Sequence, residues 1–205
     1  MPPGWLPLAD HMTDVACCFA ALCRCSCIGR ALAVAAGRSL DDQDIARLSV
    51  LAFLHDLGKA SSGFQAKRWP TGQRPPCWPT PSGHGAQALY LLQGDNSVDH
   101  LLNVLPLEEL ASWGAEAVLP LLTASISHHG RPLIEDIQTL GRVSRRDWQP
   151  VIYPAGRMHY DPLPVLEEIS LKARRLFPTA FELVTRPLPD NPPFANLFAG
   201  LVQFA

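Results

Sequence analysis

Apolar residues recur at helical spacing along most of this chain. The clearest run repeats every three residues and consists of Ile45, Leu48, Leu51 and Leu54. This interval places side chains on one face of a helix, so the pattern predicts a helix whose buried face leads to His55–Asp56. Similar patterns predict further helices at 8–36, 84–93, 107–127, 166–177 and 193–205.

Glycine, proline and capping residues indicate where these helices begin and end. Gly37 predicts the end of the first helix, and Ser39 with Asp42 resembles a capping box that opens the second. Prolines forbid a continuous helix between residues 68 and 82, where they occur at Pro70, Pro75, Pro76, Pro79 and Pro81. Residues 132–164 are predicted to be irregular, with one short strand at 151–153. The predicted fold class is mainly α, a helical bundle with proline-rich loops and at most a small β element.

Length and composition are those of one globular domain. The chain has 205 residues, of which 47% are hydrophobic and 18% are charged, and these values exclude a mainly disordered protein. The formal net charge is -2. Any binding of nucleic acid therefore has to rely on local positive charge or on bound metal ions.

The 6 cysteines do not form an obvious disulfide framework. Five lie within residues 17–27, in the first predicted helix, where neighbouring side chains diverge and cannot easily pair. We interpret them as small buried apolar residues of a protein in the reducing cytoplasm; a zinc cluster stays an alternative, although no C-x-x-C spacing occurs. The apolar segment 15–23 follows acidic residues and is interrupted by Arg24 and Arg30, so we expect neither a signal peptide nor a membrane span.

Histidine and aspartate supply the main chemical signal. Most of the 7 histidines lie on predicted helices or at their ends, namely His11, His55 beside Asp56, His84, and His128 beside His129. Imidazole and carboxylate groups suit transition metals, and a carboxylate can bridge two ions. Because such groups are costly to bury alone, we predict that they share one site. His100 and His159 fit no motif, and we interpret both as loop or surface residues.

Three motifs occur in a defined order along the chain. They are FLHDLGKASSGFQ at 53–65, GHGAQAL at 83–89 and SHHGRP at 127–132. A lone His-Asp pair often arises by chance. This ordered set, preceded by His11, resembles the HD nuclease domain of the CRISPR-associated type I interference nuclease-helicase. The resemblance covers nearly the whole chain, so we expect residues 1–205 to form one HD nuclease domain.

The resemblance implies a helical HD fold that holds two divalent metal ions. One ion would be held by His11, His55 and Asp56. Asp56 would bridge to the second ion, which would also be held by His84, His128 and His129. The ions would be a transition metal such as Mn, Ni, Co or Fe, or Mg. Asp56 and Lys59 are the expected catalytic residues, since Lys59 lies one helical turn beyond Asp56 and would steady the charge on a phosphate.

The activity that the resemblance implies is endonucleolytic cleavage of single-stranded DNA in CRISPR type I interference. The expected partners are a helicase domain or subunit and the RNA-guided surveillance complex that opens the target. No G-x-x-x-x-G-K-[ST] motif occurs, so we expect the ATP-driven helicase downstream in a longer protein or on a separate subunit. The family completes its first metal site with an aspartate in an Ala-Asp motif. Residues 196–205 resemble the segment before that motif, so we interpret the chain as a fragment whose missing ligand would follow Ala205.

Basic and aromatic residues near the proline-rich segment are candidates for DNA contacts. Lys67, Arg68 and Trp69 follow one another there, and cations beside aromatic rings suit the backbone and bases of a single strand. Trp69 and Trp78 equally suit the anchoring of an irregular segment against a core. Other basic candidates, for which solvated surface charge is the alternative, are Arg74, Arg142, Arg145, Arg146, Lys172, Arg174 and Arg175.

Two other functions fit parts of these motifs. An HD phosphohydrolase of nucleotides or cyclic dinucleotides would use similar ligands, although 128–136 lacks the Gly-Tyr-Pro that follows the paired histidines in the cyclic-dinucleotide relatives. A non-catalytic docking module for a helicase or surveillance complex would need no metal. Metal content therefore separates the two enzymes from the docking module.

Overall fold

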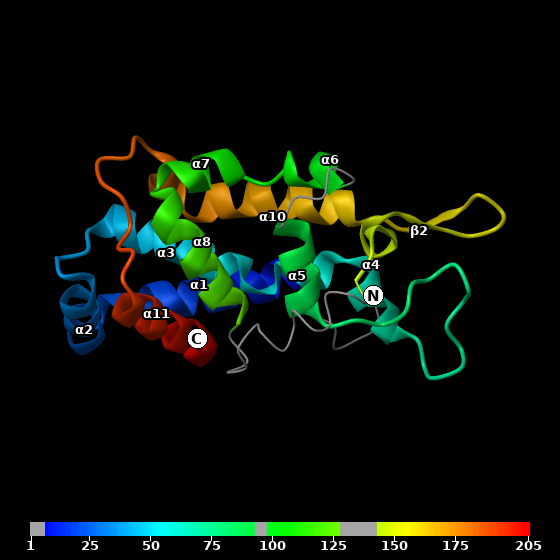
Figure 1. Ribbon diagram of the computed structural model, residues 1–205, viewed down its shortest axis with the longest axis horizontal. Coiled ribbons are helices and arrows are strands. Elements are labelled where there is room, and N and C mark those ends of the chain that lie inside the picture. Colours follow the sequence, from blue (N-terminus) through cyan, green and yellow to red (C-terminus); the bar gives the residue numbers. More distant parts are fainter. Residues whose placement is uncertain (1–6, 93–97, 128–142) are drawn as a thin grey trace. The chain divides into compact units, whose positions relative to one another are not determined.

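The computed structural model describes residues 7–92, 98–127 and 143–205 (Figure 1). Helices make up most of these residues, and a single two-stranded sheet occurs among them. The prediction of a mainly α fold is therefore confirmed. The described residues divide into two compact units. Of the described residues, unit 1 includes 7–55, 106–127 and 171–205, and unit 2 includes 56–92, 98–105 and 143–170.

Unit 1 is a bundle of helices from distant parts of the chain. Its elements are α1 (Leu8–Arg24), α2 (Ser26–Ala36), α3 (Asp42–Phe53), α7 (Leu107–Ser112), α8 (Ala115–Ile126), the 3-10 turn η5 (Pro178–Phe181) and α11 (Pro192–Phe204). α1 packs along α3, and α11 packs against α8 and α2. Phe19 on α1 meets Phe198 on α11 edge to face, with ring centroids 5.3 Å apart. The buried Ser125 hydroxyl on α8 donates to the Leu51 carbonyl on α3 over 2.8 Å.

The helix predicted over 8–36 is wrong in one respect, because the chain bends by 86° between α1 and α2. Cys25, between the two helices, is extended with φ -67° and ψ 129°. Gly29 then approaches the preceding turn so closely that a Cβ there would lie 2.8 Å from the Cys23 carbonyl oxygen. α2 ends at Gly37 in the left-handed region, as predicted. None of the described helices is by itself long and apolar enough to cross a membrane; the bent pair α1–α2 reaches that length and composition together.

The helix predicted over 107–127 is also interrupted. α7 and α8 are separated at Trp113 and Gly114, where Gly114 has φ 112° and ψ 95°, a conformation that side chains disfavour. The Leu188 amide donates to the Trp113 carbonyl over 2.7 Å. A Cβ on Gly114 would meet Pro187 at 2.8 Å. A segment far along the chain therefore occupies the position where the helix would have continued.

The start of α3 differs from the predicted capping box. Asp41 is the N-cap, and its carboxylate accepts from the Asp44 amide over 2.8 Å, while Asp44 accepts in return from the Asp41 amide. The prediction of Ser39 with Asp42 was two residues too early. Tertiary contacts favour the observed register, because the buried Asp44 carboxylate also binds Arg186 over 2.9 Å.

Unit 2 is built from short helical turns, irregular segments and one hairpin. Its elements are the 3-10 turn η1 (Leu54–Ala60), which continues from unit 1, α4 (Ser62–Gln65), η2 (Ala66–Arg68), α5 (His84–Leu92), α6 (Asp99–Leu102), η4 (Arg145–Trp148), β1 (Val151–Ile152), β2 (Met158–Tyr160) and the first part of α10 (Pro162–Leu176). The strands are antiparallel, with Val151 opposite Tyr160. The irregular segment 69–83 and the strand at 151 confirm the predictions. The sequence did not predict the second strand or η4. It also predicted that α10 begins at residue 166, four residues later than the structure shows.

The proline-rich segment is anchored by its second tryptophan. Trp78 has no exposed surface and forms a small core with Ala66 and Val151. Tyr160 stacks on Trp78 with ring centroids 5.9 Å apart. The anchoring alternative is therefore correct for Trp78, because a fully buried ring has no face on which a base can stack.

Most cysteines are exposed, which contradicts the prediction that they are buried. Only Cys23 is buried, and burial raises the pKa of its thiol to about 12. Cys17, Cys18, Cys25 and Cys27 are exposed, Cys77 is half-buried, and all six thiols are free. No cysteine belongs to a cluster of three or more ligand-type side chains in the described part of the chain, so the structure lends no support to a zinc cluster.

The Asp44 carboxylate should stabilise unit 1 in a pH-dependent way. Burial by itself raises the pKa of Asp44, but the hydrogen bonds from Arg38 and the Asp41 amide, together with the charge of Arg186, outweigh it and hold that pKa below its usual value. The stabilisation is thus fully present above the unfolded pKa of about 3.9 and is lost as the pH falls through the lower folded value.

We therefore expect Asp44→Asn to lower the free energy of unfolding at pH 7 by about 2 kcal/mol, less than for a fully buried pair because both arginines are partly exposed. The difference from the wild type should shrink below about pH 4. Urea denaturation across this pH range measures it. Asp42→Asn, at an exposed position of the same helix turn, is the matched control and should stay near zero. Equal effects of the two substitutions would contradict the argument.

Candidate metal centre

The His55–Asp56 pair lies where α3 gives way to a tighter turn. α3 ends at Phe53, and η1 follows with Asp56 at φ -106° and ψ 17°. These angles lie near the sparsely populated bridge region, which occurs often in active sites. Both side chains are buried, with 3% of His55 and 0% of Asp56 exposed. The sequence therefore delivers an imidazole and a carboxylate into the interior at consecutive positions.

The hydrogen bond of His55 leaves one ring nitrogen suited to a metal ion. Nδ1 of His55 lies 2.8 Å from the Ala52 carbonyl oxygen. Because a carbonyl only accepts, Nδ1 is the donor of this hydrogen bond, and Nε2 is the ring nitrogen that could bind a metal ion. A backbone carbonyl that fixes the tautomer in this way is a usual companion of a metal-binding histidine.

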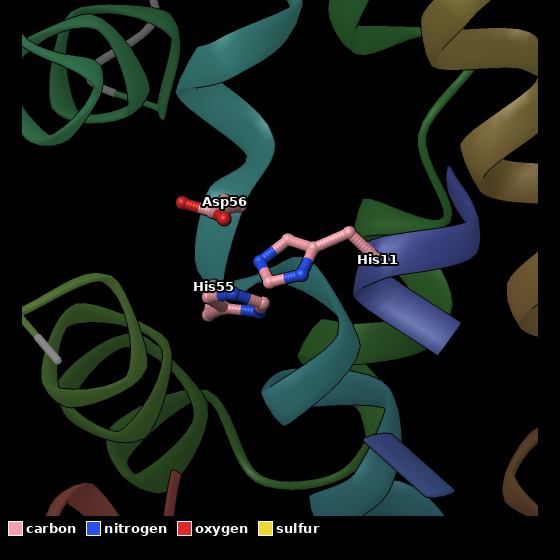
Figure 2. Close-up of side chains that lie close together, drawn as sticks. All are labelled: His11, His55 and Asp56. Carbon is pink, nitrogen blue, oxygen red and sulfur yellow. The ribbon is translucent and has the colours of Figure 1, made fainter. Parts of the chain in front are cut away.

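His11 joins this pair from α1, as Figure 2 shows. The rings of His11 and His55 meet edge to face, with centroids 5.4 Å apart. One ligand atom from each of His11, His55 and Asp56 lies within 4.8 Å of the other two. Two imidazoles and a carboxylate are a donor set that first-row transition metals accept. These three residues therefore fit the metal ion that was predicted for them.

Asp56 also contacts a lysine and a third histidine within unit 2. Lys59 Nζ lies 2.5 Å from Asp56 Oδ2, and His84 Nε2 lies 3.4 Å from Oδ1. Both carboxylate oxygens therefore have polar neighbours. The structure thus places Lys59 and His84 beside Asp56.

Gly58 allows η1 to lie directly against the start of α5. A Cβ at this position would be 1.8 Å from the His84 carbonyl oxygen and 2.8 Å from the Ala88 amide nitrogen. Any side chain at residue 58 would thus push the two segments apart. The absence of a side chain is what brings the His84 ring within reach of Asp56.

Two side chains hold the carbonyls at the end of η1. Gln65 Nε2 donates to the Lys59 carbonyl over 2.8 Å, and the Tyr160 hydroxyl donates to the Ala60 carbonyl over 2.6 Å. Burial raises the pKa of Tyr160 above its usual value, and the charge of Asp161 adds to the effect. The phenol is therefore a neutral, permanent donor near neutral pH, and it ties β2 to the residue after Lys59.

Comparison with known protein families agrees with this geometry. The family described as "Cas3, HD domain" matches residues 1–205, the whole chain. The chain belongs to the Cas3 HD domain family. This is a family of CRISPR-associated, metal-dependent HD nucleases, so the resemblance stated from the motifs is confirmed. Neither the curated proteins nor the solved structures that were searched contain a match.

The other residues predicted for the Cas3 HD domain site have different surroundings. His128, His129 and Arg142 lie outside the described residues. Lys67 and Arg68 are exposed, whereas Trp69 is half-buried with its ring 6.2 Å from that of Trp78. His100 is exposed, as expected.

His159 is not the simple surface residue that was predicted. Its ring centroid lies 4.8 Å from that of Tyr153 and 5.3 Å from that of Trp78. Burial, with the charges of Arg68 and Arg157 as further causes, lowers the pKa of His159. The residue packs in the aromatic cluster because it lies on β2, a strand that the sequence pattern did not reveal.

Sequence reasoning assigned no role to several residues that shape this site. Gly58, Phe64 and Gln65 all lie in the first motif, so the motif itself carried a signal for them. Tyr160 lies in no motif, and only its hydrogen bond to Ala60 identifies it.

Gly58→Ala should separate η1 from α5. We expect a loss of about 2 kcal/mol in the free energy of unfolding, as for other substitutions that overpack a core, together with weaker metal binding. Thermal unfolding and calorimetric titration with Mn²⁺ measure the two effects. Gly83→Ala is the matched control, because a Cβ there meets nothing within 4 Å although the residue adjoins His84. Equal stability and equal metal affinity for the two variants would contradict this role of Gly58.

Proposed function

We propose that this Cas3 HD domain is an endonuclease that cuts single-stranded DNA with two divalent metal ions. The cluster of His11, His55 and Asp56 carries the proposal, because its atoms fit a metal ion and the family is one of nucleases. Bound ions of this kind activate a water for attack on phosphorus and offset charge on the attacking and leaving oxygens. The side chains of the protein would hold these ions and orient the substrate.

In this proposal Asp56 serves both ions. His11 and His55 would complete the protein ligands of the first ion on the described part of the chain. His84, with its Nε2 3.4 Å from the carboxylate, would bind the second. The family pattern adds His128 and His129 to that second ion. When bound, the ions would supply an activated water and offset the charge on the reacting oxygens.

Lys59 is proposed to act on the substrate phosphate. Its ammonium group lies 2.5 Å from Asp56 and retains 25% of its side-chain surface exposed. In a complex with substrate, this ammonium group would donate to a non-bridging phosphate oxygen. A preorganised donor at the position where negative charge grows stabilises the transition state.

The substrate and partners follow from the family together with the charge of the chain. A net charge of -2 does not attract DNA by itself, so local lysines, bound ions and partner proteins have to recruit the strand. We propose a helicase domain or subunit and an RNA-guided surveillance complex in the cytoplasm as those partners, the latter opening the target so that a single strand reaches the site.

The test is Asp56→Ala, with metal stoichiometry and cleavage of a single-stranded oligonucleotide measured on the same preparation. We expect loss of bound metal and at least a 100-fold loss of Mn²⁺-supported cleavage, since even outer-shell changes cost about 10- to 100-fold. Circular dichroism should show unchanged helical content. His100→Ala, an exposed histidine away from the motifs, is the control and should retain activity.

Each alternative function has its own outcome in this test. Full cleavage by the Asp56→Ala variant would overturn the two-metal mechanism. Metal binding together with hydrolysis of nucleotides or cyclic dinucleotides, and none of DNA, would identify a phosphohydrolase. A wild-type protein that binds no metal and cuts nothing would be a docking module.

A further inference from the structure

Two of the three lysines of this chain lie around one aromatic ring in unit 2. Lys67 Nζ is 4.5 Å from the centroid of the Phe64 ring, and Lys59 Nζ is 6.0 Å from it. The His84 ring meets Phe64 edge to face, with centroids 5.6 Å apart. Phe64 therefore connects Lys67 to the residues that contact Asp56.

Two ammonium groups lie around the Phe64 ring, and they differ in their ion-pair partners among the described residues. Lys59 is paired with Asp56, but no ion pair of Lys67 is found in the described part of the chain. Burial lowers the pKa of Lys67, and the nearby charge of Lys59 lowers it further. The ring face offers a favourable place for a cation. An ammonium group that lies on this ring without a carboxylate partner favours an anionic ligand.

Two arginines that contact the proline-rich segment are already bound to the protein. Arg74 donates to the carbonyls of Trp78 and Pro79. Arg146 donates to the Pro76 carbonyl over 2.9 Å. These arginines hold the proline-rich segment in place. Lys67, in contrast, is exposed and lies over an aromatic ring. Within residues 7–92, 98–127 and 143–205 no hydrogen bond or ion pair of its ammonium group is found, so that group can donate to a ligand.

We infer that Lys67, supported by Phe64, binds a phosphodiester of the substrate strand next to the phosphate that is cleaved. This inference rests on the proposed nuclease function and assigns the subsite for the flanking nucleotide. Lys59 would face the cleaved phosphate and Lys67 its neighbour, since both surround the same ring. A single strand has phosphates at regular short intervals, and an ammonium group recognises them without regard to base sequence.

Lys67→Gln should weaken strand binding and leave the chemical step unchanged. We expect KM for Mn²⁺-supported cleavage of an oligothymidylate to rise about tenfold, as for loss of one charge-assisted hydrogen bond, with kcat within a factor of two. Binding of the same oligonucleotide should also be measured in EDTA at several salt concentrations. The slope of log Kd against log salt should be smaller by about 0.7 for Lys67→Gln than for the wild type, which is the value for one phosphate contact on a single strand. Lys67→Arg should restore the slope.

Arg30→Gln is the matched control, because it removes one exposed positive charge from α2 and should leave both KM and the salt slope unchanged. Phe64→Leu keeps an apolar side chain but removes the ring, and we expect it to raise KM about threefold with an unchanged slope, because the ammonium group remains but is held less well. An unaltered salt slope in Lys67→Gln would overturn the subsite even if the wild type cuts DNA. If the wild type binds the strand but does not cut it, the nuclease proposal fails, and the slope still decides whether Lys67 contacts phosphate.

Discussion

A carboxylate with no exposed surface needs partners in order to stay charged, and the burial of Asp56 imposes this requirement on the whole site. Removing an isolated carboxylate from water costs several kcal/mol even after the protein relaxes. Here Lys59 and His84 contact its two oxygens, and a ligand atom of His11 and of His55 lies within 4.8 Å. Each of these partners is basic. The ion pair with Lys59 makes the buried charge tolerable, and the two nearby imidazoles complete a donor set that suits a metal ion.

The first motif acts as one folded element rather than as a set of separate ligands. After the His-Asp pair, Gly58 admits the backbone of α5, and this contact sets the position of His84. Gln65 returns to the Lys59 carbonyl, while Phe64 carries a cation on its ring. The spacing between the His-Asp pair and the Phe-Gln pair therefore has a physical basis, because the Gln65 side chain hydrogen-bonds back to the Lys59 carbonyl.

The proposed binding of an anionic strand depends on the local arrangement of basic groups and not on the net charge of the chain. The chain is slightly acidic overall, and several of its basic groups are used internally. Lys172 pairs with Asp10, and Arg174 lies 2.6 Å from Glu109. Basic residues that look alike in the sequence thus differ in whether they already have an ion-pair partner in the protein. Only contacts in the folded chain separate the groups that hold the structure from a group such as Lys67 that remains available.

The sequence by itself determined the features that depend on local spacing. The three-residue repeat of α3 predicted a buried face, Gly37 predicted a helix end, and prolines predicted the irregular segment after residue 68. The ordered histidine motifs identified the family, because metal ligands have to occur in a set order on a given fold. Tertiary structure decided the rest. The break at Gly114 depends on Pro187, the cap of α3 depends on Arg186, and the donor to the Ala60 carbonyl is Tyr160. These partners are separated by 70 residues or more in the printed sequence, and no local pattern encodes which distant segment will fill a given space.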